Sequence, residues 1–408
     1  MKNEKITLAI IGCGQFARHF VPLFKAHPHV ERVYVCDLEQ AKVEEYVEKF
    51  NVSPVGSFEE VLAREDINAV AIFTERHKHG PMVVAALRAG KNVYSAVPMA
   101  SSVEDCGEIV KAVEETGKVY MMGETCIYYP CAMFCKREYE KGTFGKFVFA
   151  EAQYFHDLAH FSDYFRSNRP ASAVPPFLYP THSTGMVLWA TGSHVTKVSA
   201  VGYVDTEENT PFAIGENPWD NVFSNEFALM QLSCGGAMRI AECRRIGHKA
   251  PSSSISGFYG TRADYQFHNA EHLVTVNHGT GREVELFDVS DEVNPRTMTA
   301  AKEAGGASFK AQVANHGFQW SSPAPIQDEE YARLPEAYLD EKLPNGHMAS
   351  HKLLIDDFCS AAYHGTMPRV NAWLAARFTV PGLVAHESAK QGGVLLDVPD
   401  FGDAPESL

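Results

Sequence analysis

The amino-acid sequence predicts two unlike domains in one chain. Residues 1–125 are expected to form an α/β domain with a doubly wound parallel sheet, and residues 126–408 an α+β domain with an open, mostly antiparallel sheet. Short apolar runs alternate with amphipathic helical patterns in the first part, which is typical of βαβ units. A glycine-rich turn follows the first apolar run. In the second part most apolar runs alternate with polar residues, as in an antiparallel sheet with one covered face.

The first domain is expected to alternate strands and helices. Ser57 is a suitable N-cap with Glu60 at the capping-box position, and Gly90 and Gly117 each end a helix. Right-handed crossovers between such units produce a parallel sheet. The strands are predicted at residues 6–11, 32–36, 69–73, 92–95 and 119–122, and the helices at residues 16–24, 38–50, 57–64, 81–89 and 103–116.

The second domain is expected to begin with strands and to end with two helices. Polar and proline-rich loops at residues 205–223 and 321–346 interrupt the pattern. The C-terminal helices, at residues 348–363 and 371–392, are long enough to return to the first domain. The strands are predicted at residues 144–153, 197–204, 225–232, 237–242, 254–260 and 283–289.

Charge and cysteine content exclude several classes of protein. The 51 acidic residues outnumber the 36 Lys and Arg, which gives a net charge of −15, and no basic stripe suited to a nucleic-acid backbone occurs. No apolar run reaches the roughly 18 residues of a membrane span. The nine cysteines, several of them inside apolar runs, indicate reduced thiols in a cytoplasmic protein rather than a disulfide framework.

The run GCGQFA at residues 12–17 follows the first predicted strand and has the spacing G-x-G-x-x-A. Gly12 permits a tight turn, and Gly14 lets the backbone approach a pyrophosphate. Gln15 and Phe16 then open a helix whose free N–H groups attract an anion. Asp37 ends the second strand, about 20 residues further on, where a carboxylate accepts hydrogen bonds from a ribose 2′-OH. No Arg or Lys directly follows this carboxylate, so the site favours NAD over NADP.

Further motifs occur in a characteristic order. Residues 71–79 (AIFTERHKH) resemble a strand followed by T-P-x-x-x-H, and residues 89–93 (AGKNV) resemble A-G-K-x-V. Residues 142–145 (GTFG) resemble G-x-[IF]-G at the entry to a second domain, and residues 368–372 and 387–389 fit the same ending. By these motifs nearly the whole chain resembles the Gfo/Idh/MocA family of oxidoreductases.

The resemblance implies a Rossmann domain followed by an open sheet that serves as a dimer or tetramer interface, so we expect a homodimer or homotetramer. It also implies hydride exchange between a nicotinamide and a carbon of a sugar or cyclitol. Thr74, His79 and Pro98 are expected to line the cofactor pocket. One position departs from the family, because its E-K-P occurs here as Ala96-Val97-Pro98. Valine cannot transfer a proton, so either the acid–base chemistry lies elsewhere or activity is lost.

Two more motifs suggest a branch of this family. Residues 154–158 (YFHDL) and 179–185 (YPTHSTG) resemble the NAD-dependent α-N-acetylgalactosaminidases, a branch that also tends to carry valine in place of the lysine. Glu124 and Tyr128 fit the same branch. With Tyr154, they are expected to contact the substrate.

His182 is the first candidate for a catalytic base. Hydride leaves a secondary alcohol carbon only if the hydroxyl proton is removed, and histidine is the natural base near neutral pH. His182 follows Pro180 at an expected helix N-terminus, which favours the neutral, proton-accepting imidazole. Tyr179 is a candidate proton relay, and His156 is a further catalytic candidate.

Three functions remain open at this point. The first is net oxidoreduction of a sugar or glycoside at ring C3. The second is redox-neutral glycoside cleavage: oxidation at C3 acidifies the C2 proton, the C1 substituent leaves, water adds and the hydride returns, so no flanking pair of carboxylates is needed. The third, suggested only by Val97, is a sugar- or NAD-sensing protein without activity. Candidate sugar contacts in or beside the two polar loops are Asn217, Trp219, Trp320 and Tyr331.

No metal site is expected. Cys126, Cys131 and Cys135 follow one another closely, but nothing nearby supplies a fourth ligand at the usual spacing. His347 and His351 are four residues apart, a spacing that can bind zinc on a helix, but no glutamate follows the first as in H-E-x-x-H.

Overall fold

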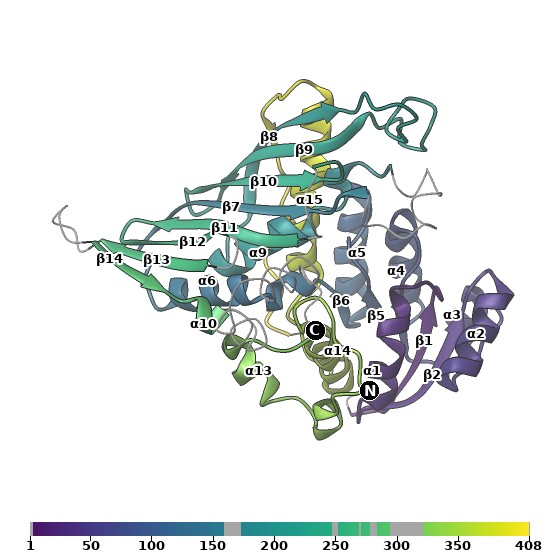
Figure 1. Ribbon diagram of the computed structural model, residues 1–408. Coiled ribbons are helices and arrows are strands. Elements are labelled where there is room, and N and C mark those ends of the chain that lie inside the picture. Colours follow the sequence, from purple (N-terminus) through teal and green to yellow (C-terminus); the bar gives the residue numbers. More distant parts are fainter. Residues whose placement is uncertain are drawn as a thin grey trace. The chain divides into compact units, whose positions relative to one another are not determined.

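The computed structural model describes residues 3–158, 173–246, 252–268, 271–277, 284–293 and 321–407. The chain forms two compact units, each with its own sheet (Figure 1). Unit 1 comprises Met1–Thr125, Glu330–Ala376 and Phe401–Leu408, and unit 2 comprises Cys126–Glu329 and Arg377–Asp400.

Unit 1 is built on a six-stranded sheet with the strand order β3-β2-β1-β4-β5-β6. Every pairing is parallel, so the predicted doubly wound sheet is confirmed. The order reverses between β1 and β4, and in such sheets ligands bind outside the carboxyl ends of the strands at this switch point. The strands are β1 (Ile6–Ile11), β2 (Val30–Cys36), β3 (Ser53–Pro54), β4 (Ala69–Ile72), β5 (Asn92–Ser95) and β6 (Tyr120–Met122).

The helices of unit 1 follow the predicted pattern with one difference at the start. The expected helix at residues 16–24 is a 3₁₀ turn, η1 (Ala17–His19), followed by α1 (Val21–Ala26). Pro22 lies in the first turn of α1, where its missing N–H and fixed φ suit a helix start rather than a helix interior. The Ser57 cap is confirmed, since its side chain accepts from the N–H of Glu60. The other helices are α2 (Gln40–Phe50), α3 (Phe58–Ala63), α4 (His79–Arg88), α5 (Val103–Thr116) and α14 (His351–His364).

Unit 2 is built on a nine-stranded sheet with the order β14-β13-β12-β11-β7-β10-β9-β8-β15. The pairings are antiparallel except between β7 and β10, so the predicted mostly antiparallel sheet is confirmed. The sequence analysis did not predict the hairpin of β12 and β13. The strands are β7 (Phe147–Phe155), β8 (Val195–Val204), β9 (Phe223–Leu232), β10 (Ala237–Cys243), β11 (Ser252–Gly260), β12 (Ala263–His268), β13 (Glu271–Asn277), β14 (Val284–Asp288) and β15 (Leu396–Asp397).

Within unit 2, α6 (Pro130–Glu140) packs on α9 (Thr181–Thr191), and α9 packs on β7, β10 and β11 (Figure 1). Val148, Val201 and Leu229 on the strands keep large apolar side chains exposed. The remaining helices are α10 (Ser290–Val293), α13 (Asp328–Tyr331) and α15 (Ala372–Lys390), of which α13 and α15 each contribute residues to both units. Among the helices that the structure describes, none has the length and apolar character needed to cross a membrane.

Candidate active site

The glycine turn of unit 1 is fixed by close contacts on one side and is open on the other. Gly12 has a φ of +97°, and a Cβ there would lie 2.7 Å from the carbonyl oxygen of Phe73, so only glycine fits. Tyr46 donates its hydroxyl hydrogen to the carbonyl oxygen of Gly14. In contrast, no atom of the residues that the structure describes lies within 4 Å of the place that a Cβ on Gly14 would take. The backbone beside Gly14 is therefore accessible to a ligand, as a pyrophosphate requires.

The carboxylate of Asp37 is held rigidly at the end of β2. The N–H of Cys13 donates to its Oδ2 at 2.7 Å, and the N–H of Glu39 donates to its Oδ1 at 2.9 Å. Lys42 pairs with Glu39, with 2.5 Å between Nζ and Oε1. A ribose hydroxyl can donate to this fixed carboxylate, whereas a 2′-phosphate would meet a negative charge. The turn and the carboxylate thus fit NAD, and Gln15 and Phe16 are exposed at the tip of the turn.

Thr74, His79 and Pro98 lie together in unit 1, but the His79 side chain is buried. Its Nδ1 lies 2.8 Å from the carbonyl oxygen of Pro98, and its Nε2 lies 3.1 Å from that of Thr74. Burial lowers the pKa of His79, against the opposing effect of these hydrogen bonds. His79 therefore fixes two backbone segments to each other. Ala96 and Val97 are buried as well and offer no ionisable group in this stretch.

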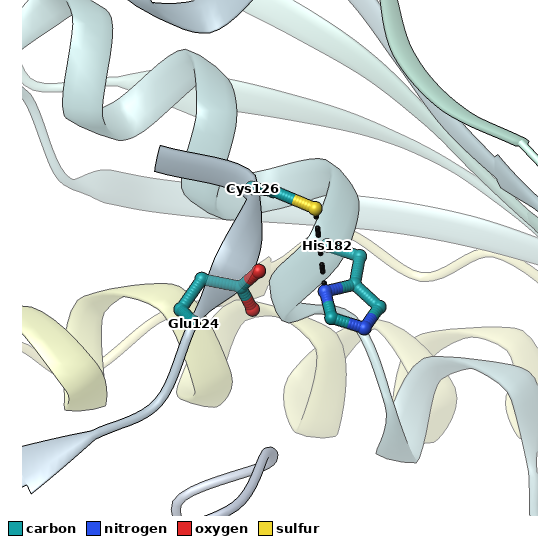
Figure 2. Close-up of side chains that lie close together, drawn as sticks. All are labelled: Glu124, Cys126 and His182. Carbon is teal, nitrogen blue, oxygen red and sulfur yellow. Dashed lines mark hydrogen bonds between the residues drawn. The ribbon is translucent and has the colours of Figure 1, made fainter. Parts of the chain in front are cut away.

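In unit 2, both ring nitrogens of His182 are engaged. The residue lies in the first turn of α9, as expected, and its Nε2 is 3.2 Å from the Tyr179 hydroxyl. Its Nδ1 is 3.3 Å from the Sγ of Cys126, as Figure 2 shows. Ser253 donates its hydroxyl hydrogen to the carbonyl oxygen of His182 at 2.7 Å. The imidazole is therefore held in one orientation by groups that lie far apart in the sequence.

This arrangement can move a proton without moving a heavy atom. In one form the Tyr179 hydroxyl donates to Nε2 of His182, and Nδ1–H points at the sulfur of Cys126. In the other form the Cys126 thiol donates to Nδ1, and Nε2–H donates to the oxygen of Tyr179. His182 can therefore accept a proton from Tyr179 at Nε2 while its Nδ1 stays in contact with the sulfur of Cys126. We refer to Tyr179, His182 and Cys126 as the proton relay.

Tyr154 packs on the relay from β7. Its ring centroid lies 5.1 Å from that of His182 and 5.8 Å from that of Tyr179. The guanidinium carbon of Arg244 lies 4.8 Å from the centre of the Tyr154 ring, within cation–π range. His156, directly after β7, stands 5.7 Å from Tyr154 between ring centres. The three sequence candidates Tyr154, Tyr179 and His182 are thus brought together, and His156 adjoins them through Tyr154.

Two buried glutamates support the segment that carries Tyr179 and His182. Glu226 on β9 and Glu242 on β10 are directly opposite in the antiparallel register and are fully buried. Glu226 accepts from the N–H of Phe177 at 2.7 Å and contacts His386 Nδ1 at 2.7 Å. Glu242 accepts from the Ser183 hydroxyl at 2.5 Å, and Arg244 lies 3.4 Å away. The two carboxylates therefore hold both ends of residues 177–183.

Glu124 lies close to Cys126 and His182, as Figure 2 shows, whereas the other sequence candidates are held by different contacts. Tyr128, in the 3₁₀ turn η3 (Thr125–Tyr128), is buried and accepts from Gln327 Nε2 through its carbonyl oxygen. Trp219 lies in a loop held by Asn217, whose Nδ2 donates to three backbone carbonyl oxygens of that loop. Glu124 is buried near the end of unit 1, two residues before Cys126, and Figure 2 labels it. Tyr331 is bonded within unit 1, and Trp320 lies outside the described residues.

Sequence reasoning missed the residues that orient the relay. In the sequence, Cys126 stands out only as a possible metal ligand together with Cys131 and Cys135. Glu226 and Glu242 carry a usable signature, since each is an acid on the buried phase of an alternating strand, where a charge needs a partner. The role of Ser253 depends on the pairing of strands and has no signature in the sequence.

Comparisons with known proteins concern the family and the fold. Residues 6–124 match the family model described as "Oxidoreductase family, NAD-binding Rossmann fold", that of Gfo/Idh/MocA. A solved structure of levoglucosan dehydrogenase with NADH and levoglucosan has a TM-score of 0.73 at 17% identity and covers 97% of this chain and 100% of that one. At this identity the likeness concerns the fold.

Curated relatives carry glycosidase names. A glycosyl hydrolase family 109 protein of Saccharopolyspora erythraea is 22% identical over an alignment of 429 positions, gaps included, which covers 98% of this chain and 84% of that protein. An alpha-N-acetylgalactosaminidase of Shewanella oneidensis is 30% identical over 207 residues. That alignment covers 46% of this chain and 44% of the Shewanella protein, so it spans less than half of either.

Proposed function

We propose that this chain, whose residues 6–124 match the NAD-binding Rossmann fold of the Gfo/Idh/MocA oxidoreductase family, transfers a hydride between NAD and ring carbon C3 of a sugar or glycoside. The observation that supports the chemistry is the proton relay of Tyr179, His182 and Cys126. It offers a positioned base and donor in a chain that has Val97 where the family has lysine. NAD, when bound, supplies the hydride acceptor and donor.

The residues have distinct roles in this proposal. The backbone at Gly12 and Gly14 would hold the pyrophosphate, and Asp37 would hold the adenosine ribose. As the C3–H bond transfers its electron pair, the C3 hydroxyl gives its proton to Tyr179, which passes its own to Nε2 of His182. C3 becomes a carbonyl, and the proton remains on the relay for the reverse step.

Redox-neutral glycoside cleavage is the second candidate, and the names of the curated relatives favour it. A C3 carbonyl makes the C2 proton acidic, so a base can remove it while the bond from C1 to the leaving group breaks. Water then adds to C1 with return of the C2 proton, and the hydride returns to C3. This route needs the same relay and leaves no net change in the cofactor.

A panel of α- and β-glycosides tests both functions together. Purified protein with added NAD is incubated with each substrate, and NADH and released aglycone are measured in the same sample. NADH that rises with substrate supports the dehydrogenase, and aglycone release without net NADH supports the redox-neutral glycosidase. Absence of both signals across sugars, glycosides and polyols, in protein that still binds NAD, would reject both in favour of a binding protein.

A further inference from the structure

Residues 345–351 of unit 1 have an unusual backbone. His347, Met348 and Ala349 have φ values of +49°, +54° and +62°, so three successive residues with side chains occupy the left-handed region. Each such residue costs about 1 kcal/mol or more, and a run of them persists only where other contacts enforce it. The Tyr331 hydroxyl donates to the carbonyl oxygen of Ala349 at 2.5 Å and accepts from Nδ2 of Asn345 at 2.6 Å. The strained segment therefore lowers the free energy of unfolding, and these hydrogen bonds hold it in place.

Hydrogen bonds within the segment decide which nitrogen of His347 carries a hydrogen. The N–H of Gly346 donates to Nδ1 of His351 at 3.3 Å, so the hydrogen of the neutral His351 ring is on Nε2. That Nε2 lies 2.9 Å from Nδ1 of His347, which must accept. Burial lowers the pKa of His351 to about 3, so this ring is neutral across the physiological range. The hydrogen of a neutral His347 is then on Nε2.

The glycine turn lies directly against this pair of imidazoles. The Phe16 ring meets His347 edge-on at 5.7 Å between ring centres and His351 at 6.0 Å. His351 also packs on Phe20 at 4.6 Å, and Phe20 packs on Phe73, whose carbonyl oxygen limits Gly12. His347 is thus fixed to the exposed tip of the turn through Phe16, the residue after Gln15.

We propose that His347 is a cofactor-binding residue that donates its Nε2–H to the pyrophosphate of NAD. The inference rests on NAD as the cofactor of unit 1 and adds a side-chain donor to the backbone groups of the turn. A donor beside an anion strengthens binding most when it is oriented in advance, which the hydrogen bonds from Gly346 and His351 achieve. This role would explain the strained backbone, because the strained segment fixes the orientation of the His347 ring, whereas a relaxed loop would let the ring rotate.

The test measures the binding of NAD and of ADP-ribose by calorimetry, without substrate. ADP-ribose carries the pyrophosphate but no nicotinamide. His347→Asn should weaken both ligands by about tenfold or more, because asparagine lacks the distal donor. Asparagine tolerates positive φ well, so this variant should fold. His347→Gln places an amide N–H close to the original Nε2 and should restore most of the affinity.

Two controls separate a direct contact from a loosened segment. Met348→Gly relieves one left-handed residue and leaves the His347 ring in place, so it should bind both ligands as the parent does. His364→Asn changes a histidine elsewhere in unit 1 and should have no effect on binding. Parent-like binding by His347→Asn, a loss confined to NAD, or an equal loss in Met348→Gly would each overturn the proposal. A parent protein that binds neither ligand would instead reject the cofactor assignment.

Discussion

The glycine turn of unit 1 and the proton relay of unit 2 are built in opposite ways. The turn is one unbroken run, residues 12–17, whose backbone groups would bind the cofactor, and the contacts that shape it come from Phe73 and Tyr46. The relay uses side chains, and its orientation depends on Ser253 and Glu242 from distant strands. A site formed by backbone groups can therefore be recognised from a short sequence motif, whereas a site formed by side chains depends on the whole topology of its unit.

The largest effect is expected from removing the relay's base. His182→Ala should lower kcat by about 10²–10⁴-fold, because no group replaces the proton acceptor. The dissociation constant of NAD should stay unchanged, since the turn that would hold NAD belongs to unit 1. Steady-state kinetics and calorimetry on the same preparation measure the two quantities separately.

Tyr179→Phe removes only the hydroxyl of the relay and should reduce kcat in the same direction. His194→Asn and Tyr203→Phe are matched controls on side chains of unit 2 that are partly exposed. Full activity in His182→Ala would show that the acid–base chemistry lies elsewhere.

The two glycines of the turn should respond differently to the same substitution. Gly12→Ala places a Cβ 2.7 Å from a backbone oxygen at positive φ, so it should lower the free energy of unfolding by about 1–3 kcal/mol and weaken NAD binding. Within the described part of the chain, the new Cβ of Gly14→Ala meets no atom within 4 Å, so this variant should leave stability unchanged and weaken NAD binding alone. Thermal unfolding without ligand, followed by calorimetry with NAD, distinguishes the two. Equal thermal stability of both variants would contradict the assigned contacts.

Changing the contacts that Glu242 makes with Ser183 and Arg244 is expected to have a smaller effect on activity. Glu242→Gln keeps an acceptor for Ser183 but leaves the buried guanidinium of Arg244 without its anion, which should cost about 1–3 kcal/mol of stability. Because Arg244 packs on Tyr154 beside the relay, kcat and its pH profile should change as well. Denaturant unfolding and kinetics at several pH values measure these effects.

Glu151→Gln is the matched control for Glu242→Gln. Glu151 lies on β7, pairs with Arg239 of β10 at 2.7 Å, and both side chains are partly exposed. Such pairs contribute at most about 1 kcal/mol, so this variant should be near-neutral with an unchanged pH profile. An equal effect of the two substitutions would mean that Glu242 has no special role in orienting the relay.

The sequence predicted the parallel sheet well because the strands of unit 1 are continuous buried runs between capped helices. The prediction from sequence was wrong where the local pattern is weak or where tertiary contacts override it. The strands β12 and β13 are short and carry polar residues between their apolar ones, and β12 pairs with β11, which lies earlier in the chain. The helix expected at residues 16–24 is interrupted at Phe20, because Pro22 suits the first turn of a new helix rather than a helix interior.

The candidate site divides in the same way. Gly12, Gly14 and Asp37 follow from spacing alone, because the turn needs glycine at fixed positions and the acid must end the next strand. Tyr179 and His182 came from a motif and share a hydrogen bond in the structure. The role of Cys126 could not be predicted from a motif, since residues 126 and 182 come together only when unit 2 folds.

The smallest effect is expected at Cys126, where two interpretations of one contact can be separated. As a member of the relay, the thiol orients the imidazole by a single hydrogen bond, so Cys126→Ala should lower kcat by about five- to tenfold and Cys126→Ser should restore it.

Thiol and imidazole are also zinc ligands, and both belong to a group of side chains that could hold an ion. Because we expect the relay to work without metal, treatment with a chelator should leave activity unchanged, with the exposed Cys234→Ser as the control for thiol loss. Serine is a poor zinc ligand but an adequate hydrogen-bond partner. Activity lost both on chelation and in Cys126→Ser would therefore replace the relay with a metal centre, whereas activity kept in both would leave the hydrogen bond as the reason for the cysteine's position.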